Sequence, residues 1–403
     1  MKADVLKIGT ALILVCTAAQ GQGLLSLGQR TDYKENIPLT VNVTAGGGYD
    51  HTTYGGPSSS ADNVDSAFMQ GGIGLSHASS NHVTKTVLGA DFSAIHYLDD
   101  NQNGKQTYYN ARVSFDLEHS FSRRLSVKNS FYLAYEIEPD YSIGATSGRR
   151  AGQYLYGYDN FSVSYAWSER FAATTGYTVT GIHYKDEDQA EREDRWSQIV
   201  SEQLSYKLNR NTTLAAEYRF EYTNYTKNNG SNGLASPDYK AHYLLVGVDQ
   251  AWSPKLNSSV RAGAEIFESD RVSQTSPYLE GSLTYGLSRT SSLRWYNQLG
   301  YDGSDLGDYN ARYAYHTGIV ASQKITEKLT GNAGIHYVHS SYKGNDVTPS
   351  TTDNEINASV GMNYKIWKNL SVDANYSYTT IASDISSREY DRHYTTLGVN
   401  ASF

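Results

Sequence analysis

The sequence is poor in cysteine and proline. Its one cysteine, Cys16, lies near the N-terminus, and only 7 of the 403 residues are proline. A disulfide framework is therefore excluded. No Pro-rich, Ser-rich or charge-run linker divides the chain, so we expect one long domain instead of several soluble ones.

After its N-terminal segment the chain also lacks an apolar run long enough for a membrane helix. Hydrophobic residues make up 39% of the sequence, which nevertheless holds 35 tyrosines and 35 glycines, and the mean hydropathy is -0.55. A membrane barrel explains this combination, because only alternate residues of its strands face lipid while the others face the inside.

The first residues resemble a secretory signal, with an early basic region, an apolar stretch over 8–19 and small residues at Ala19 and Gly21. We therefore predict a signal peptide at 1–21, a periplasmic segment at 22–38 and an outer-membrane barrel at 39–403. Cys16 would be removed with the signal. A lipoprotein cut at Cys16 is the alternative, although Val15 is bulkier than the small residue typical of such sites.

The rest of the chain repeats one unit: a strand that alternates apolar with polar residues, a tight turn, a second such strand and a looser loop. Clear copies begin at Leu125, Leu214, Leu329 and Leu370. The repeat is roughly 40 residues long, a length that also suggests propeller blades. A blade would hold four strands of about five residues, whereas this alternation runs through two strands of about ten, the length that a tilted membrane strand needs.

The pattern predicts an all-β fold, a transmembrane up-and-down antiparallel barrel of about 18 strands, with 16 as the alternative. An even number places both chain ends on the periplasmic side. We expect strands near 39–50, 64–77, 83–98, 107–121, 124–138, 153–167, 171–185, 195–208, 212–226, 239–252, 256–268, 275–287, 292–301, 309–323, 328–342, 353–367, 369–380 and 391–403.

One face of each predicted strand carries the charged residues, and we expect that face to line a water-filled pore. Both signs occur in nearly equal measure, so strong ion selectivity does not follow, although acidic loops favour cations slightly. For any single residue, pairing with a neighbouring strand is the competing interpretation. The predicted pore-lining residues are Arg112, Asp116, Glu118, Lys128, Glu217, Arg219, Glu221, Asp249, Arg261, Glu265, Glu280, Arg294, Arg312, Glu355, Lys365, Asp373 and Arg392.

Aromatic residues gather at the predicted strand ends, which indicates two girdles at the two membrane interfaces. Beside the tight turns lie Phe121, Trp167, Phe171, Trp252, Trp367 and Phe403. Near the loop ends lie Tyr97, Tyr109, Tyr135, Tyr154, Tyr222, Tyr239, Tyr301, Tyr309 and Tyr342.

The chain stops on an alternating strand that ends in Phe403. This ending resembles the terminal signal by which the barrel assembly machinery recognises bacterial outer-membrane proteins, although Thr395 stands where that pattern often has an aromatic residue. With the signal peptide, the repeated hairpins and the girdles, the chain after about residue 38 resembles bacterial outer-membrane porins, and most closely the group called putative beta-barrel porins. The resemblance implies an integral outer-membrane protein of the Gram-negative envelope that passes small hydrophilic solutes passively.

We therefore expect a porin-like pore that contacts outer-membrane lipids, with a homo-oligomer left open. The alternative is a non-conducting barrel that acts in surface binding or envelope structure. No connection exceeds about fifteen residues, so we expect no inward-folded loop and a channel that is wide or closed by a partner.

Other chemistries find little support. The net charge is -8 and no basic face occurs, so we expect no nucleic acid partner. We find no set of Ser and His residues that would converge for a lipase in the wall, so we predict no enzyme and no cofactor. Asp99–Gly104 matches half of a calcium loop, but Asn110 stands where a bidentate Glu is needed, and we predict no metal site.

Overall fold

The structure is a computed structural model that describes residues 37–55, 63–99, 106–138, 152–226, 238–270, 272–288, 291–306, 309, 311–344 and 349–403. The predicted signal peptide and most of the predicted periplasmic segment lie outside these residues. The strands are β1 (Ile37–Tyr54), β2 (Val64–Ser80), β3 (Thr84–Tyr97), β4 (Thr107–Ser120), β5 (Leu125–Glu136), β6 (Tyr154–Ala166), β7 (Phe171–Tyr184), β8 (Arg195–Lys207), β9 (Thr212–Tyr225), β10 (Tyr239–Ser253), β11 (Leu256–Ser269), β12 (Ser273–Ser288), β13 (Ser291–Asp302), β14 (Ala311–Lys324), β15 (Leu329–Lys343), β16 (Thr351–Trp367), β17 (Leu370–Ser383) and β18 (Tyr390–Ser402).

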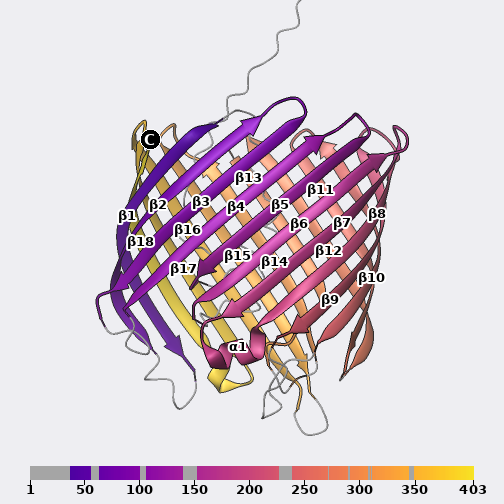
Figure 1. Ribbon diagram of the computed structural model, residues 1–403. Coiled ribbons are helices and arrows are strands. Elements are labelled where there is room, and N and C mark those ends of the chain that lie inside the picture. The colour runs from indigo at the N-terminus through magenta and orange to yellow at the C-terminus, as the bar shows by residue number, and fades with distance from the viewer. Residues whose placement is uncertain are drawn as a thin grey trace, which may run out of the picture.

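These strands form one closed antiparallel ring (Figure 1). Each strand pairs with its neighbour in sequence, and β1 pairs with β18 from Asn42 opposite Ser402 to Tyr54 opposite Tyr390. The predicted barrel of 18 strands is confirmed, and the alternative of 16 is wrong. Closure leaves no strand edge unpaired, which a sheet in hydrocarbon requires.

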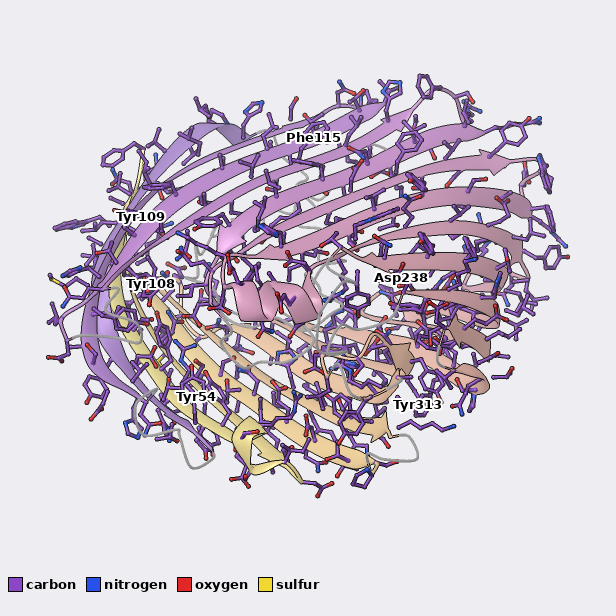
Figure 2. The ribbon with its side chains drawn as sticks, turned by 60° about the horizontal axis from the view of Figure 1, so that its bottom comes forward. Tyr54, Tyr108, Tyr109, Phe115, Asp238 and Tyr313 are labelled. Carbon is purple, nitrogen blue, oxygen red and sulfur yellow. The ribbon has the colours of Figure 1, made fainter. Side chains whose placement is uncertain are left out.

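The two faces of the wall follow the period of two in the sequence. On β4, Tyr108 is 8% exposed and its neighbour Tyr109 is 51% exposed (Figure 2). Leucine, valine, isoleucine and aromatic side chains are exposed on the outer face, for example Leu244 and Val246 on β10. The inner positions are mostly polar, with the addition of many buried tyrosines.

Short polar turns connect the strands at one rim, the turn rim, where the C-terminus also lies (Figure 1). Four of these turns repeat one pattern in which a hydroxyl oxygen accepts backbone N–H groups two and three residues later. The pairs of hydroxyl residue and last N–H donor are Ser122 with Leu125, Ser168 with Phe171, Ser253 with Leu256 and Thr326 with Leu329. This local cap explains why each strand restarts at an apolar residue after a hydroxyl residue.

The opposite rim, the loop rim, carries the longer connections and two short helices. The helix α1 (Glu187–Glu193) begins at Asp186, whose side chain accepts a hydrogen bond from the Gln189 N–H. The 3-10 helix η5 (Ser386–Arg388) lies between β17 and β18. Seen from the loop rim, α1 lies in front of the opening of the ring (Figure 2). Among the described residues, no helix is both long and apolar enough to cross a membrane.

Candidate functional site

The residues predicted to line the pore all lie on strands, at positions that alternate with outer-face side chains. On β9, for example, Glu217 and Arg219 flank Tyr218, which is 43% exposed. Two contacts between these charged residues, Arg219 with Glu280 and Arg261 with Glu217, join strands that are not adjacent in the ring. Only side chains on the concave, inner face of the wall can reach across an intervening strand in this way.

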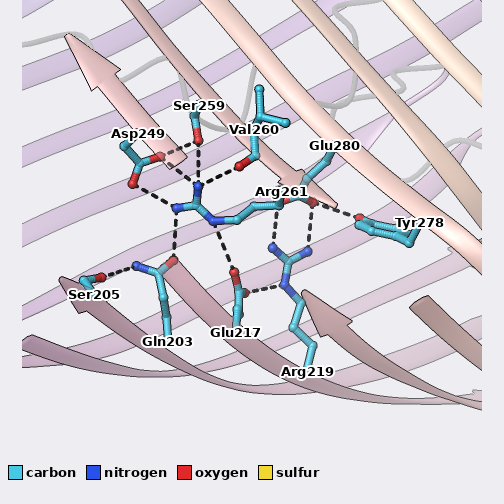
Figure 3. Close-up of polar contacts among 10 residues, drawn as sticks. All are labelled: Gln203, Ser205, Glu217, Arg219, Asp249, Ser259, Val260, Arg261, Tyr278 and Glu280. Atoms are coloured by element: carbon cyan, nitrogen blue, oxygen red, sulfur yellow. Dashed lines mark hydrogen bonds and ion pairs between the residues drawn. The ribbon is translucent and has the colours of Figure 1, made fainter. Parts of the chain in front are cut away.

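The largest of these networks spans β8 to β12 (Figure 3). Arg219 on β9 donates two hydrogen bonds of 2.9 and 2.7 Å to Glu280 on β12, over the intervening strands β10 and β11. Arg261 on β11 donates two bonds of 2.9 Å to Asp249 on β10. Both arginines also pair with Glu217. The cationic groups are therefore held in fixed bidentate geometry.

A glycine makes room for this network. Gly247 on β10 lies opposite Arg261, and a Cβ atom at this position would lie 2.5 Å from Arg261 Cδ and 3.0 Å from Nη1. The same Cβ atom would lie 2.1 Å from the backbone oxygen of Val260, so a side chain at 247 would displace both the neighbouring strand and the arginine.

A second network joins β18 to the far end of β5. Arg392 donates hydrogen bonds of 2.9 and 2.7 Å to Asp50 on β1 and one of 3.0 Å to Glu138, with which it also forms a closer contact. Tyr97 on β3 donates a third bond to Asp50, of 2.9 Å. Four strands separate β18 from β5 in the ring, a path of about 24 Å along the wall. Glu138 and the adjacent Ile137 must therefore leave the wall and fold inward.

A third network closes over the loop rim. Arg388 in η5 donates bonds of 2.8 Å to both Asp305 and Asp353, and Tyr342 donates one of 2.7 Å to Asp305. Asp305 belongs to the connection between β13 and β14. In that connection Gly303 lies against Tyr225 on β9 and Tyr239 on β10, because a Cβ atom there would lie 2.1 Å from the Tyr225 hydroxyl and 3.3 Å from Tyr239 Cε1. This connection therefore also folds inward, across the positions of β11 and β12.

The prediction of a bore without inward-folded segments is thus wrong. Two segments of the chain itself, Ile137–Glu138 and Gly303–Leu306, narrow the loop half of the barrel. The first belongs to the connection 137–153 between β5 and β6, the longest between two strands and longer than the predicted limit of about fifteen residues. The second belongs to the short connection 303–310, whose length gave no sign of it. The carboxylates of Glu138 and Asp305, with the cation of Arg388, are site residues that the sequence pattern missed.

The bridge between Arg388 and Asp305 gives a pH-dependent prediction. Burial alone would raise the pKa of Asp305, but the nearby charges of Arg388 and Arg312 outweigh it and lower the pKa to about 2. The unfolded chain has a value of about 3.9, so the ionised carboxylate stabilises the fold by about 2 kcal/mol at neutral pH. This contribution is complete above the unfolded value and disappears as the pH falls through about 2.

Thermal unfolding of the natural protein and of Asp305→Asn should therefore differ at pH 7 and converge near pH 2. The comparison isolates Asp305, because all other carboxylates titrate in both proteins. A stability difference that stays constant down to pH 2 would contradict the assignment.

Two glutamates on β9 and β11 are held mainly by neutral donors. The Glu221 carboxylate accepts hydrogen bonds from the tyrosine hydroxyls of Tyr239 and Tyr243, at 2.9 and 3.1 Å. Glu265 is 0% exposed, and its Oε2 atom accepts the backbone N–H of Tyr301 at 2.8 Å. Its Oε1 atom has no hydrogen-bond partner among the described residues. Uncharged groups therefore hold both carboxyl groups on the inner face of the wall.

The other predicted residues form smaller contacts. Arg112 binds Glu136, Lys128 lies 3.8 Å from Glu118, Ser130 donates to Asp116, and Arg312 binds Asp302. Glu355 is buried on β16, while Lys365 and Asp373 lie on β16 and β17 toward the turn rim. The Nε atom of Arg294 is buried without a partner in the part of the chain that the structure describes.

Carboxylates outnumber cations in the buried interior. Among the described residues, nine Asp and Glu residues are buried against three arginines and no lysine. The buried carboxylates are Asp50, Glu136, Glu138, Glu193, Asp194, Glu265, Asp305, Asp353 and Glu355, and the buried arginines are Arg261, Arg312 and Arg392. Even with the half-buried arginines included, the loop half of the interior carries net negative charge.

The predicted tyrosine girdle at the loop ends is only partly correct. Tyr109 is exposed on the outer face, but Tyr97, Tyr154, Tyr239, Tyr309 and Tyr342 are buried. These five rings instead pack inside the loop half, where Tyr342 and Tyr97 hold Asp305 and Asp50. The tyrosines therefore fill the interior and orient its carboxylates.

The aromatic residues beside the tight turns are mostly exposed at the turn rim. Phe121, Trp167, Trp252, Trp367 and Phe403 each have more than half of their surface exposed. Trp167 stacks on Phe171 with ring centroids 5.1 Å apart. Their role as a girdle at the periplasmic interface of the membrane stays a prediction.

No group of three His, Cys, Asp or Glu residues that could hold a metal ion occurs among the described residues. Most of the half-matching calcium loop, residues 100–104, lies outside them.

Comparison with known proteins supports the resemblance. Residues 238–403, which span β10 to β18, match the model of a family described as "Putative beta-barrel porin 2". The predicted resemblance to this group of porins is thereby confirmed for that part of the chain. No curated protein matches the chain.

Several solved structures are similar to the chain. OccK9 (OpdG) of Pseudomonas aeruginosa aligns with 10% identity over 95% of this chain and 100% of its own, with a TM-score of 0.48. A BenF-like porin of Pseudomonas fluorescens Pf-5 aligns with 10% identity over 91% and 99%, with a TM-score of 0.48. OpdK of Pseudomonas aeruginosa, crystallised with vanillate, aligns with 12% identity over 91% and 99%, with a TM-score of 0.46.

Proposed function

We propose that this protein is a porin-type pore of the bacterial outer membrane that lets small hydrophilic solutes and ions diffuse passively. The single observation that carries the proposal is the closed ring of strands, apolar outside and charged inside. A wall of this size encloses more space than wall side chains fill. The family match of residues 238–403 supports the same function.

The charged inner positions, from Arg112 on β4 to Arg392 on β18, are proposed to line the path. The networks fix their charges, so the path presents a preorganised field instead of mobile side chains. Because buried carboxylates exceed buried cations, we propose that this field favours cations. The proposed activity is transport without catalysis.

Reconstitution in planar bilayers tests the pore directly. We expect steady open steps and, under a salt gradient, a reversal potential of the sign that cation preference gives. A reversal potential of the opposite sign would contradict the charge assignment and leave the pore intact. If correctly folded protein, identified by its heat-modifiable migration, gives no conductance, the proposed pore is wrong.

The alternative is a non-conducting barrel that acts in surface binding or envelope structure. The inward-folded segments Ile137–Glu138 and Gly303–Leu306 and the buried tyrosines favour it, because they occupy the loop half of the interior. Swelling of liposomes in neutral sugars of increasing size separates the two functions. A pore admits the small sugars and excludes the larger ones, whereas a sealed barrel admits none.

The chain end fits the predicted delivery to the membrane. The N–H and C=O groups of Phe403 exchange hydrogen bonds with Val41 on β1, at 2.9 and 3.0 Å. The terminal residue therefore belongs to the seam that closes the ring. We propose that the barrel assembly machinery recognises this last strand before it pairs with β1.

A further inference from the structure

Two carboxylates interrupt the apolar outer face of the barrel. Asp159 on β6 and Glu202 on β8 are exposed and share the outward side of their strands with Phe161, Val200 and Leu204. Every other outward Asp, Glu, Lys or Arg on the described strands lies within two residues of a strand end: Asp65, Lys240, Glu268, Lys343 and Asp391.

The depth of these two residues places them in hydrocarbon. Asp159 lies eight residues before Trp167, and Glu202 lies six residues before Leu208, both at the turn rim. A strand tilted by about 40° climbs about 2.5 Å per residue, which puts the carboxylates roughly 20 and 15 Å above that rim. The apolar band of such barrels is about 25 Å tall, so both lie well inside it.

Neutral polar groups surround the carboxylates and form a polar strip across β5 to β8. Asn129 on β5 donates a hydrogen bond of 2.6 Å to Asp159, and Thr175 on β7 donates one of 2.5 Å to Glu202. Gln198 shares the outward side of β8 with Glu202. One such bond leaves most of the acceptor capacity of a carboxylate unused, and lipid offers no donor to fill it.

We propose that this strip, composed of Asn129, Asp159, Thr175, Gln198 and Glu202, is buried against a second copy of the same chain. Two copies inserted in one direction are related by an axis along the membrane normal, so each group keeps its depth and the strip meets itself. The strip carries both amide and hydroxyl donors and carboxylate acceptors at similar depths. It is therefore complementary to itself, as a two-fold interface requires.

Cysteine cross-linking in intact outer membranes tests the interface. Val200 lies between Gln198 and Glu202 and is 47% exposed, while Val360 on β16, far around the ring, is 45% exposed. Val200→Cys should form a disulfide-linked dimer on mild oxidation, about tenfold more than Val360→Cys, because contact raises the effective thiol concentration. Cys16 lies in the predicted signal peptide and is common to both variants, so it cannot explain a difference.

A second variant distinguishes an interface between two copies from a wall in which the two carboxylates simply face lipid. Added to Val200→Cys, the pair Asp159→Leu and Glu202→Leu should strongly reduce the cross-linked dimer. It should also shift the native mass in mild detergent to that of one chain, with conductance retained. Equal cross-linking at positions 200 and 360, or an unchanged dimer in the leucine variant, would overturn the proposal. So would a disulfide between the thiol introduced at position 200 and a chain of different mass. None of these outcomes affects the proposed pore.

Discussion

Replacing Arg392 by alanine is expected to lower the free energy of unfolding of the barrel by about 3–5 kcal/mol. The guanidinium is the shared partner of Asp50, which is 0% exposed, and of the buried Glu138. Without it two carboxylates remain in a water-poor site with few donors, and each loses its strongest contact. Urea unfolding of the protein in lipid vesicles, followed by heat-modifiable migration, measures the loss.

The same variant should also change permeation. Arg392 is the charged contact between the inward-folded Ile137–Glu138 segment and β18, next to the packing of Ile137 against the cluster that contains Tyr394. Its removal should therefore loosen the segment and increase single-channel conductance. Arg294→Ala is the matched control, since the Nε atom of Arg294 has no partner among the described residues. Its removal should cost less than about 1 kcal/mol. An equal loss of stability in both variants would show that the ion pairs of Arg392 with Asp50 and Glu138 do not stabilise the fold.

The wall of the barrel could be predicted from the sequence because one physical rule determines it. Alternation places every second side chain in lipid, and a slip by one residue would bury the whole charged face of a strand in hydrocarbon. The inner positions of Glu217, Arg219 and Glu221 follow from this rule alone. Even the contacts between neighbouring strands are implicit in the order of the hairpins.

The ion pairs and inward-folded segments inside the barrel were harder to predict, because they depend on contacts between residues that are far apart in the sequence. The pairs of Arg392 with Glu138 and of Arg388 with Asp305 join residues 254 and 83 positions apart, and no local pattern specifies them. The inner position of some of the buried tyrosines could be predicted. Tyr97 lies six residues after Asp91 on β3, so the period of two places both side chains on the inner face. We nevertheless predicted Tyr97 in the girdle because it lies at a strand end.

Neutralising Glu221 and Glu265 together, as Glu221→Gln with Glu265→Gln, is expected to lower the preference of the pore for cations at least about fivefold. Tyrosine hydroxyls and a backbone N–H hold the two carboxyl groups on the inner face of the wall, and the comparison is made at pH 9, where both groups carry charge. A charge about 5 Å from a passing ion, at an effective dielectric constant of about 40, contributes roughly 1–2 kcal/mol. Reversal potentials under a salt gradient measure the change.

Glu268→Gln provides a control on the same strand as Glu265. Glu268 lies three residues away on β11 but faces outward and is exposed, so its charge is screened from the lumen by the wall and by salt. Its replacement should leave the reversal potential unchanged, while the double variant moves it toward zero. Because Glu265 Oε1 is buried without a partner among the described residues, removing its charge should not weaken the fold, and a changed reversal potential then reports permeation and not unfolding. Equal shifts from Glu268→Gln and from the double variant would place the selective charge outside the barrel, at its mouth.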